Sequence, residues 1–294
     1  MTVEGTVSWR ALLAETEARL CGHDGDAAGR HARWLCEEAS GHDGGELDRH
    51  LDDSATVRGV ARLDAMVARR LDGEPIQYVL GHWPFRGLDL AVDRRVLIPR
   101  PETEQVVEVA LAEVDRIGGR ERELTVVDLG TGSGAIALSI TVERPRTRTW
   151  ATDVDADALA VARANLAGVG RAATRVAIAQ GSWFEALPPE LRGQVDLVVS
   201  NPPYVSPTDD VDGAVRDWEP AGALWSGEDG LDALRHLVAS APEWLTDRGA
   251  LVVEIGAAQG PVVVELARAA GFAEVEVLPD LSRRDRVLRA RRSA

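Results

Sequence analysis

From residue 124 onward the sequence repeats one pattern: a short apolar run, a turn of glycine or polar residues, and a longer amphipathic stretch. The short runs have the length of buried strands, and the longer stretches have helical spacing of apolar residues. Strands that alternate with helices in this way form a mostly parallel sheet covered by helices. The pattern therefore predicts a doubly wound α/β fold, and no stretch approaches the roughly 20 apolar residues that cross a membrane.

The expected elements of this half can be placed along the chain. Strands are expected at residues 124–130, 148–154, 175–181, 195–200, 250–256, 273–279 and 285–291. Helices are expected at residues 135–144, 157–169, 230–245 and 261–271. We interpret the arginine-rich stretch at residues 283–292 as solvated charge around an edge strand.

The first part of the chain has a different pattern. Residues 1–75 place apolar side chains three and four apart, and two GHDG segments interrupt these runs at residues 22–25 and 41–44. This pattern predicts a small helical bundle. Residues 76–97 change to short alternating runs, LDLAV and RRVLI, punctuated by Gly and Pro, which favours a β-hairpin linker. A second domain is then expected over residues 98–294.

The charge balance narrows the classes of partner. The chain has 294 residues, 48 acidic against 33 basic side chains, no lysine, and a formal net charge of −15. Because contacts to phosphate dominate the affinity of nucleic-acid binding, we expect no direct nucleic-acid partner and no membrane partner. The acidic first twenty residues do not resemble a signal peptide. Two cysteines cannot form a disulfide framework, and their spacing with the histidines fits no zinc pattern, so we expect a cytoplasmic protein without a metal.

A glycine-rich turn follows the strand at residues 124–130. Glycines at 130, 132 and 134 give the spacing G-x-G-x-G, whereas a dinucleotide fingerprint has the spacing G-x-G-x-x-G. Asp128 precedes the turn, where we expect it to meet a cationic or hydroxyl-bearing ligand. The loop resembles the cofactor loop of class I methyltransferases, which bind S-adenosylmethionine. A glycine turn without any ligand is the alternative.

An acidic residue ends the next strand. Asp153 lies about 20 residues beyond the glycine loop, the position at which a carboxylate accepts both hydroxyls of a ribose. Asp155 and Asp157 are nearby, but acidic residues are also favoured in the first turn of a helix. We therefore expect Asp153 to contact a nucleoside and the other two to begin the following helix.

The segment Asn201-Pro202-Pro203-Tyr204 follows the strand at residues 195–200. The prolines stiffen the backbone and remove two N–H donors, so carbonyl oxygens remain free. The side-chain oxygen of Asn201 and the carbonyl of Pro202 can accept both hydrogens of a planar NH₂ group, and Tyr204 can stack on its plane. Such acceptors orient a weakly nucleophilic nitrogen toward a methyl donor and stabilise the positive charge that develops during transfer.

Together these motifs carry a family resemblance. The chain resembles the release factor glutamine methyltransferases (the HemK/PrmC family) over roughly residues 11–291. Besides the glycine loop and the Asn-Pro-Pro-Tyr segment, the similar blocks are GEPIQYVLG at 73–81, FRGLDLAVDRRVLIPRPETE at 85–104, QGSWF at 180–184, DWEPAGAL at 217–224 and DRVLRAR at 285–291.

The resemblance implies roles for particular positions. The residues that would bind S-adenosylmethionine are Gly130, Thr131, Gly132, Ser133, Gly134, Asp153, Trp183 and Asn201, with Trp183 against the adenine. The residues that would hold the substrate glutamine are Asn201, Pro202, Pro203 and Tyr204, of which Asn201, Pro202 and Tyr204 would act in catalysis. Arg100 and Glu102 would line the mouth of the pocket.

In this family the glutamine belongs to the Gly-Gly-Gln tip of a peptide-chain release factor, and its side-chain amide nitrogen (N5) receives the methyl group. We expect the acidic helical domain to dock this protein partner and the enzyme to act as a monomer. Two positions depart from the family pattern. Ser182 stands where many members have an acidic residue, and Arg283 stands where a glycine is expected in a turn.

Two other functions remain open at the level of sequence. The same Asn-Pro-Pro-Tyr chemistry serves amino methyltransferases that act on a flipped adenine or cytosine. The net charge of −15 and the absence of a long basic insertion count against that function. A cofactor-binding scaffold without catalysis is the third hypothesis, and the intact glycine loop and Asn201–Tyr204 segment argue against it.

Overall fold

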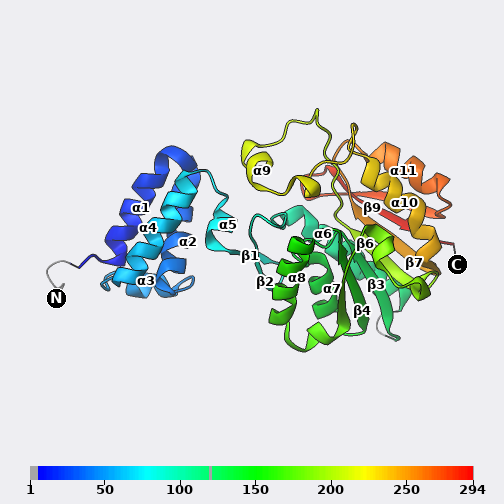
Figure 1. The fold of residues 1–294 in the computed structure, drawn as a ribbon, viewed down its shortest axis with the longest axis horizontal. Coiled ribbons are helices and arrows are strands. Elements are labelled where there is room, and N and C mark those ends of the chain that lie inside the picture. Colours follow the sequence, from blue (N-terminus) through cyan, green and yellow to red (C-terminus); the bar gives the residue numbers. More distant parts are fainter. Residues whose placement is uncertain (1–5, 119–120, 294) are drawn as a thin grey trace. The chain divides into compact units, whose positions relative to one another are not determined.

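The computed structural model describes residues 6–118 and 121–293. The chain forms two compact units, Met1–His82 and Trp83–Ala294 (Figure 1). The first unit is helical, and the second is built around a seven-stranded sheet. Within the described ranges no helix combines the length and the apolar character needed to span a bilayer.

The first unit is a bundle of amphipathic helices, as its sequence predicts. Its helices are α1 (Trp9–Asp24), α2 (Ala28–Ser40), α3 (Glu46–His50), α4 (Val57–Leu71) and α5 (Ile76–Leu80). Ser8 caps α1 and Thr56 caps α4, since each side-chain oxygen accepts a backbone N–H of the first turn. The apolar faces of the helices close over a buried core that includes Leu20, Leu35 and Leu63.

A β-hairpin lies in the segment that the sequence assigns to a linker. Strands β1 (His82–Phe85) and β2 (Leu88–Ala91) pair with each other, joined by a turn in which Arg86 has a φ of 52°. The predicted hairpin is therefore present, but its two strands are residues 82–85 and 88–91, and the alternating run RRVLI at residues 94–98 is not part of it. Those residues form a turn and an extended segment, because the run at 88–91 already has its partner in β1.

The large sheet has the strand order β5-β4-β3-β6-β7-β9-β8. Its strands are β3 (Leu124–Leu129), β4 (Thr147–Asp153), β5 (Val176–Gln180), β6 (Val195–Ser200), β7 (Leu245–Glu254), β8 (Glu274–Pro279) and β9 (Asp285–Arg291). The first five in the order are parallel, whereas β9 runs antiparallel to β7 and β8. The doubly wound, mostly parallel α/β fold is therefore confirmed.

Helices cover both faces of the sheet. They are α6 (Pro101–Ile117), α7 (Ala135–Glu143), α8 (Ala156–Gly168), α10 (Asp232–Trp244) and α11 (Gly260–Ala269). The short helix α9 (Gly213–Trp218) lies instead in the segment between β6 and α10 and has no buried residue. In β3, Val126 belongs to the core shared with α6 and α7, whereas Val127 belongs to the core shared with α10 and α11. Burial on both faces explains why the strands read as nearly continuous apolar runs.

The order of the strands fixes where a ligand can bind. The chain leaves β3 toward β4 and β5 and then returns to place β6 on the other side of β3. At this reversal the loops after β3 and β6 diverge and leave a crevice at the carboxyl ends of the strands, where doubly wound folds bind ligands. The glycine loop follows β3 and the Asn-Pro-Pro-Tyr segment follows β6, so both border this crevice.

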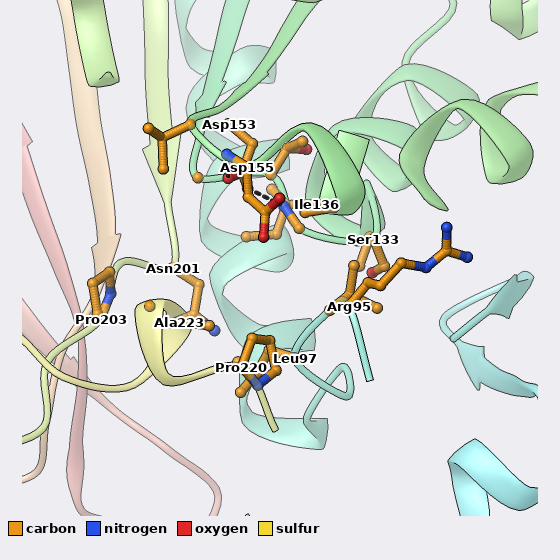
Figure 2. A pocket seen from close by; sticks show the side chains of 18 of the residues that line it. Arg95, Leu97, Ser133, Ile136, Asp153, Asp155, Asn201, Pro203, Pro220 and Ala223 are labelled. Atoms are coloured by element: carbon orange, nitrogen blue, oxygen red, sulfur yellow. Dashed lines mark hydrogen bonds between the residues drawn. The ribbon is translucent and has the colours of Figure 1, made fainter. Parts of the chain in front are cut away.

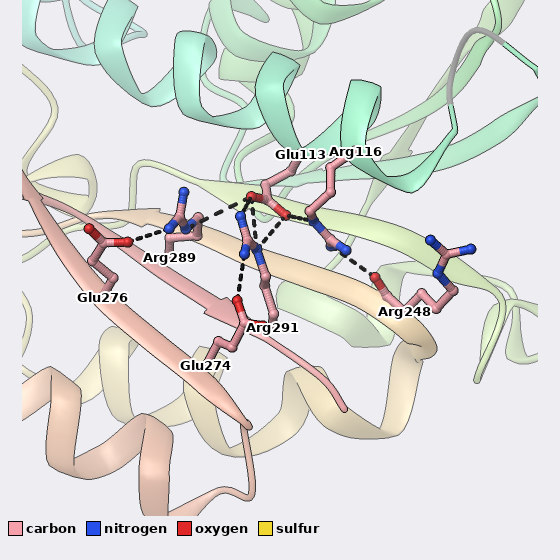
Figure 3. A network of polar contacts seen from close by, with 7 residues as sticks. All are labelled: Glu113, Arg116, Arg248, Glu274, Glu276, Arg289 and Arg291. Atoms are coloured by element: carbon pink, nitrogen blue, oxygen red, sulfur yellow. Dashed lines mark hydrogen bonds and ion pairs between the residues drawn. The ribbon is translucent and has the colours of Figure 1, made fainter. Parts of the chain in front are cut away.

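The arginine-rich stretch differs from its prediction. Strand β9 is not an edge strand, because it lies between β7 and β8. Its Arg291 is not solvated charge either: the guanidinium contacts the buried carboxylate of Glu113 on α6, with Nη2 2.6 Å from Oε1 (Figure 3). Arg116 binds the other carboxylate oxygen of Glu113 at 2.6 Å, and Glu274 on β8 pairs with Arg291 at 2.5 Å. This Glu113 cluster joins α6 to the antiparallel end of the sheet.

Candidate functional site

A cavity of about 250 Å³ opens at the carboxyl ends of β3, β4 and β6 (Figure 2). Of the site residues predicted from the sequence, eight line it: Gly130, Thr131, Gly132, Ser133, Asp153, Trp183, Asn201 and Pro203. Gly134, Pro202 and Tyr204 do not line this cavity. The glycine loop, the acidic end of β4 and the Asn-Pro-Pro-Tyr segment thus meet around one space.

The glycine loop has a backbone conformation that residues other than glycine rarely adopt. Gly130 and Gly132 have φ values of 72° and 54°, in the left-handed region that favours glycine. The loop is held from below by Asp128, whose Oδ2 accepts hydrogen bonds from the Thr131 hydroxyl (2.6 Å) and the Ala137 N–H (3.1 Å). Its bare backbone therefore forms one wall of the cavity.

Asp128 itself does not meet a ligand in the cavity, so that part of the prediction is wrong. Its side chain is fully buried beneath the loop, and its Oδ1 has no hydrogen-bond partner among the described residues. Burial raises the pKa of Asp128 to about 7, and the hydrogen bonds from Thr131 and Ala137 only partly oppose this. Its role is to shape the loop from inside.

Asp153 ends β4 and faces the cavity. Its Oδ2 accepts the N–H of Gly132 (2.9 Å), and its Oδ1 accepts the N–H of Asp155 (3.0 Å). Burial raises the pKa of Asp153, while these backbone donors lower it. Asp155 caps α8 by accepting the N–H of Asp157, which confirms that these two acids begin the helix. Each oxygen of Asp153 keeps a lone pair for a further donor.

Trp183 follows β5 in a conformation that is unusual for a large side chain. Its φ is 47°, a left-handed value that costs backbone strain. The indole ring lies beside the glycine loop, since a Cβ placed on Gly130 would lie 3.6 Å from ring atom Cζ3. Ser182, the departure from the family pattern, also lines the cavity. A flat aromatic wall therefore adjoins the glycine loop.

The Asn-Pro-Pro-Tyr segment divides its side chains between the cavity and the interior. Asn201 lines the cavity, and its Nδ2 donates to Oγ1 of Thr103 at 3.2 Å. Pro202 is buried, and Pro203 lines the cavity. The hydroxyl of Tyr204 donates to Oε1 of Glu254 at 3.2 Å. Burial, together with the negative charge of Glu254, raises the pKa of Tyr204 far above its ordinary value, so the phenol stays protonated.

Comparison with known proteins gives the family. Residues 11–81 match the PrmC N-terminal domain, and residues 113–218 match the methyltransferase small domain. The chain is 43% identical over 275 residues to a release factor glutamine methyltransferase of Cereibacter sphaeroides, covering 93% of this chain and 94% of that protein. A release factor glutamine methyltransferase of Xylella fastidiosa is 42% identical over 279 residues, covering 94% and 95% of the two chains.

The chain belongs to the release factor glutamine methyltransferase family. Among solved structures, a methyltransferase from Pyrococcus furiosus superposes with a TM-score of 0.51 at 17% identity, covering 77% of this chain and 98% of that one. At that identity the likeness concerns the fold alone, which agrees with the sheet described above.

Two further residues of this methyltransferase's site, Thr103 and Glu254, are not predicted from the sequence. Thr103, in the first turn of α6, lines the cavity and donates its hydroxyl to Oε2 of Glu254 at 2.7 Å. Glu254 ends β7 and is 1% exposed. The one sequence signal for Glu254 is that it ends an apolar strand, as Asp153 does at the end of β4.

The mouth of the cavity in this methyltransferase also differs from its prediction. Arg100 and Glu102 do not line it. The guanidinium of Arg100 instead forms an ion pair with Glu219, whose other carboxylate oxygen accepts the N–H of Ile98 at 3.1 Å. Glu219 therefore ties the segment before α6 to the DWEPAGAL segment, and Pro99 and Pro220 beside these residues reach the cavity.

Proposed function

We propose that this enzyme transfers a methyl group from S-adenosylmethionine to the side-chain amide nitrogen (N5) of the glutamine in the Gly-Gly-Gln motif of peptide-chain release factors. Membership of the release factor glutamine methyltransferase family supports this substrate. The observation that carries the proposal is that Asn201 and Pro203 line the same cavity as the glycine loop and Asp153. A cofactor and an amide can therefore meet in one space.

The residues around the cavity fit S-adenosylmethionine, which when bound supplies an electrophilic methyl group on a sulfonium. The glycine loop, Gly130 to Gly134 with Thr131 and Ser133, leaves its backbone open to the amino-acid part of the cofactor. The free lone pairs of Asp153 suit the two ribose hydroxyls. Trp183 offers an aromatic face for the adenine, and Asn201 would contact the cofactor as well as the substrate.

The amide nitrogen of the substrate is a weak nucleophile, because its lone pair is delocalised. We propose that the Oδ1 of Asn201 and the carbonyl of Pro202 accept its two hydrogens, with Pro203 and Tyr204 completing the holding segment. These acceptors fix the nitrogen and stabilise the positive charge that develops on it. The raised pKa of Tyr204 keeps its proton in place, so Tyr204 acts by holding the segment rather than as a base.

The remaining parts of the chain have roles in the same proposal. Residues 1–75 dock the release factor, residues 76–97 link the domains, and residues 98–294 form the methyltransferase domain. An acidic docking domain suits a partner with a basic contact surface. We further propose that the enzyme works in the cytoplasm as a monomer and binds neither nucleic acid nor membranes.

The test is a transfer assay with labelled S-adenosylmethionine, offered a bacterial-type release factor and duplex DNA in parallel. Peptide mass mapping then locates the added methyl group. Label on the glutamine of the Gly-Gly-Gln tip, with none on DNA, is the expected result. Label on DNA would make the enzyme a base methyltransferase, and label on neither would remove the release factor as its substrate.

A further inference from the structure

Glu254 is a buried carboxylate whose two oxygens are occupied by hydroxyl groups. Oε2 accepts from Thr103 at 2.7 Å, and Oε1 accepts from Tyr204 at 3.2 Å. Strand β7, which Glu254 ends, runs parallel to β6 with Val253 opposite Ser200, the residue before Asn201. Glu254 therefore lies directly behind the Asn-Pro-Pro-Tyr segment.

The hydroxyl of Thr103 has one proton, and the short contact to Glu254 uses it. Toward Asn201 the Thr103 oxygen can then only accept a hydrogen bond. The group of Asn201 that faces it at 3.2 Å must therefore be the NH₂ of the amide. This determines the amide orientation by hydrogen-bond logic: the NH₂ is turned to Thr103, and Oδ1 is left as an acceptor for a ligand in the cavity that Asn201 lines.

We propose that Glu254 is a positioning residue, which sets the direction of the Asn201 amide through Thr103 and anchors Tyr204 directly. This inference rests on the proposed function, because only an amide substrate requires Asn201 to present its oxygen. A glutamine side chain presents two N–H donors, so Asn201 must present oxygen to it. Were the Asn201 amide reversed, its NH₂ would face the substrate's NH₂, and the substrate would lose an acceptor.

Arg286 completes the surroundings of Glu254 without replacing the hydroxyls. Its Nη1 lies 3.2 Å from the carbonyl oxygen of Ile255 and 3.4 Å from the Tyr204 hydroxyl. Burial raises the pKa of Glu254, and the charge of Arg286 only partly opposes this. The direction of the Glu254–Thr103–Asn201 chain therefore rests on the contacts themselves, in which Thr103 and Tyr204 donate to the two carboxylate oxygens and Asn201 donates to Thr103.

The matched pair Thr103→Val and Thr103→Ser tests this inference. Valine keeps the shape of threonine but lacks the hydroxyl, so we expect kcat on the release factor to fall about 10–100-fold, as for loss of a preorganised polar contact. Serine restores the hydroxyl and most of the rate. The Kd for S-adenosylmethionine, measured by calorimetry, should rise by a smaller factor than kcat falls, because the loss is greatest where Asn201 holds the reacting amide. A wild-type kcat in Thr103→Val would overturn the proposal.

A second measurement does not depend on activity. The chain has only two asparagines, Asn165 and Asn201. Selective ¹⁵N labelling of asparagine side chains therefore gives two NH₂ signals in an NMR spectrum. Asn165 donates to the carbonyl oxygens of Ala91 and Ser133 and serves as an internal reference. We expect Thr103→Val to shift the Asn201 signal alone, and an unchanged Asn201 signal would overturn the proposal.

The path through Thr103 has its own control. Glu254→Met removes both acceptors and should reduce kcat at least as much as Thr103→Val, since Tyr204 also loses its partner. Adding Thr103→Val to Glu254→Met should cost no further rate, whereas additive losses would show that Glu254 does not act through Thr103. If Thr103→Val does not fold, Thr103→Ala takes its place in the NMR measurement. Wild-type enzyme that leaves the release factor unlabelled refutes the substrate, while the NMR result still decides the orientation of Asn201.

Discussion

Two buried glutamates lie at opposite ends of α6, and both are 1% exposed. Glu113, near the end of the helix, is surrounded by guanidinium groups, among them Arg116 and Arg291 (Figure 3). Glu254 meets the beginning of the helix through Thr103 and is held by hydroxyls. Both carboxylates are the same chemical group at the same burial, so the difference between them lies in their partners.

The partners change what each carboxylate does. Burial raises the pKa of Glu113, but the hydrogen bonds from Arg291 and Arg116 outweigh it and the net pKa is lowered. Burial also raises the pKa of Glu254, and there the hydroxyl of Thr103 and the charge of Arg286 do not reverse the effect. Arginines make Glu113 a structural tie between α6 and β9. The hydroxyl of Thr103 donates to Glu254 and accepts from Asn201, so Glu254 sets the orientation of the Asn201 amide through it.

The largest effect on stability is expected at Glu113. Glu113→Gln leaves the arginines around it without a buried counter-charge, and we expect the free energy of unfolding to fall by about 3 kcal/mol, measured by urea denaturation. The matched control is Glu276→Gln, which removes the half-exposed partner of Arg289 in the same cluster and should change stability by less than about 0.5 kcal/mol. Equal effects of the two variants would mean that the burial of Glu113 does not increase its contribution to the free energy of unfolding.

At the other end of α6 the expected loss is in rate. Asn201→Ala removes an oriented acceptor, so kcat should fall about 10²–10³-fold, equivalent to about 3–4 kcal/mol of transition-state stabilisation. The free energy of unfolding should change by no more than about 1 kcal/mol, because Asn201 makes one neutral hydrogen bond, to Thr103. Retention of most of the activity would contradict the amide-holding mechanism. Single-turnover kinetics beside denaturation curves separate the two effects.

A smaller effect, opposite in sign at the two glutamates, is expected in the dependence of stability on pH. The folded-state pKa of Glu113 is lowered, so its contribution is present above the unfolded-state pKa of about 4.5 and is lost as the pH falls through the folded-state value. The folded-state pKa of Glu254 is raised, so the carboxyl ionises first in the unfolded state. Stability therefore declines as the pH rises from the unfolded-state pKa to the folded-state pKa of Glu254.

The variants that check this are Glu113→Gln and Glu254→Gln, each followed by denaturation from about pH 2.5 to pH 8. Glu113→Gln should flatten the loss of stability toward acid pH. Glu254→Gln should remove a decline toward neutral pH. The same slope in both variants would show that the arginines and the hydroxyls do not distinguish the two carboxylates.

The smallest effect is expected at the loop that joins β8 to β9, the strand that carries both Arg286 and Arg291. Arg283 has a φ of 62° in this loop, which explains why the family pattern has glycine there. Arg283→Gly should raise the free energy of unfolding by about 0.5 kcal/mol, the relief of left-handed strain less the added entropy of the unfolded chain. Thermal unfolding measures this, and kcat should stay at the wild-type value. A lower melting temperature would contradict this account of the turn.

The sequence predicted the parts of the site that lie close together in the chain. The glycine loop and Asp153 follow strands that apolar runs reveal, and the Asn-Pro-Pro-Tyr segment is a local motif. Glu254 and Thr103 could not be paired in advance, because 151 positions separate them and only the packing of α6 against the sheet brings them together. The interior position of β9 escaped prediction for the same reason, since the order of strands is not written in any one segment.

The place of β9 also has a consequence for how the enzyme is made. During translation β8 emerges from the ribosome before β9, yet β9 is the strand that pairs with β7. Until residues 285–291 have emerged, β7 keeps an unpaired edge, and Arg286 is absent from the surroundings of Glu254 and Tyr204. Pairing of β9 with β7 therefore covers this edge and also brings Arg286 to Tyr204. The same strand thus protects the edge of the sheet and completes the surroundings of the proposed site.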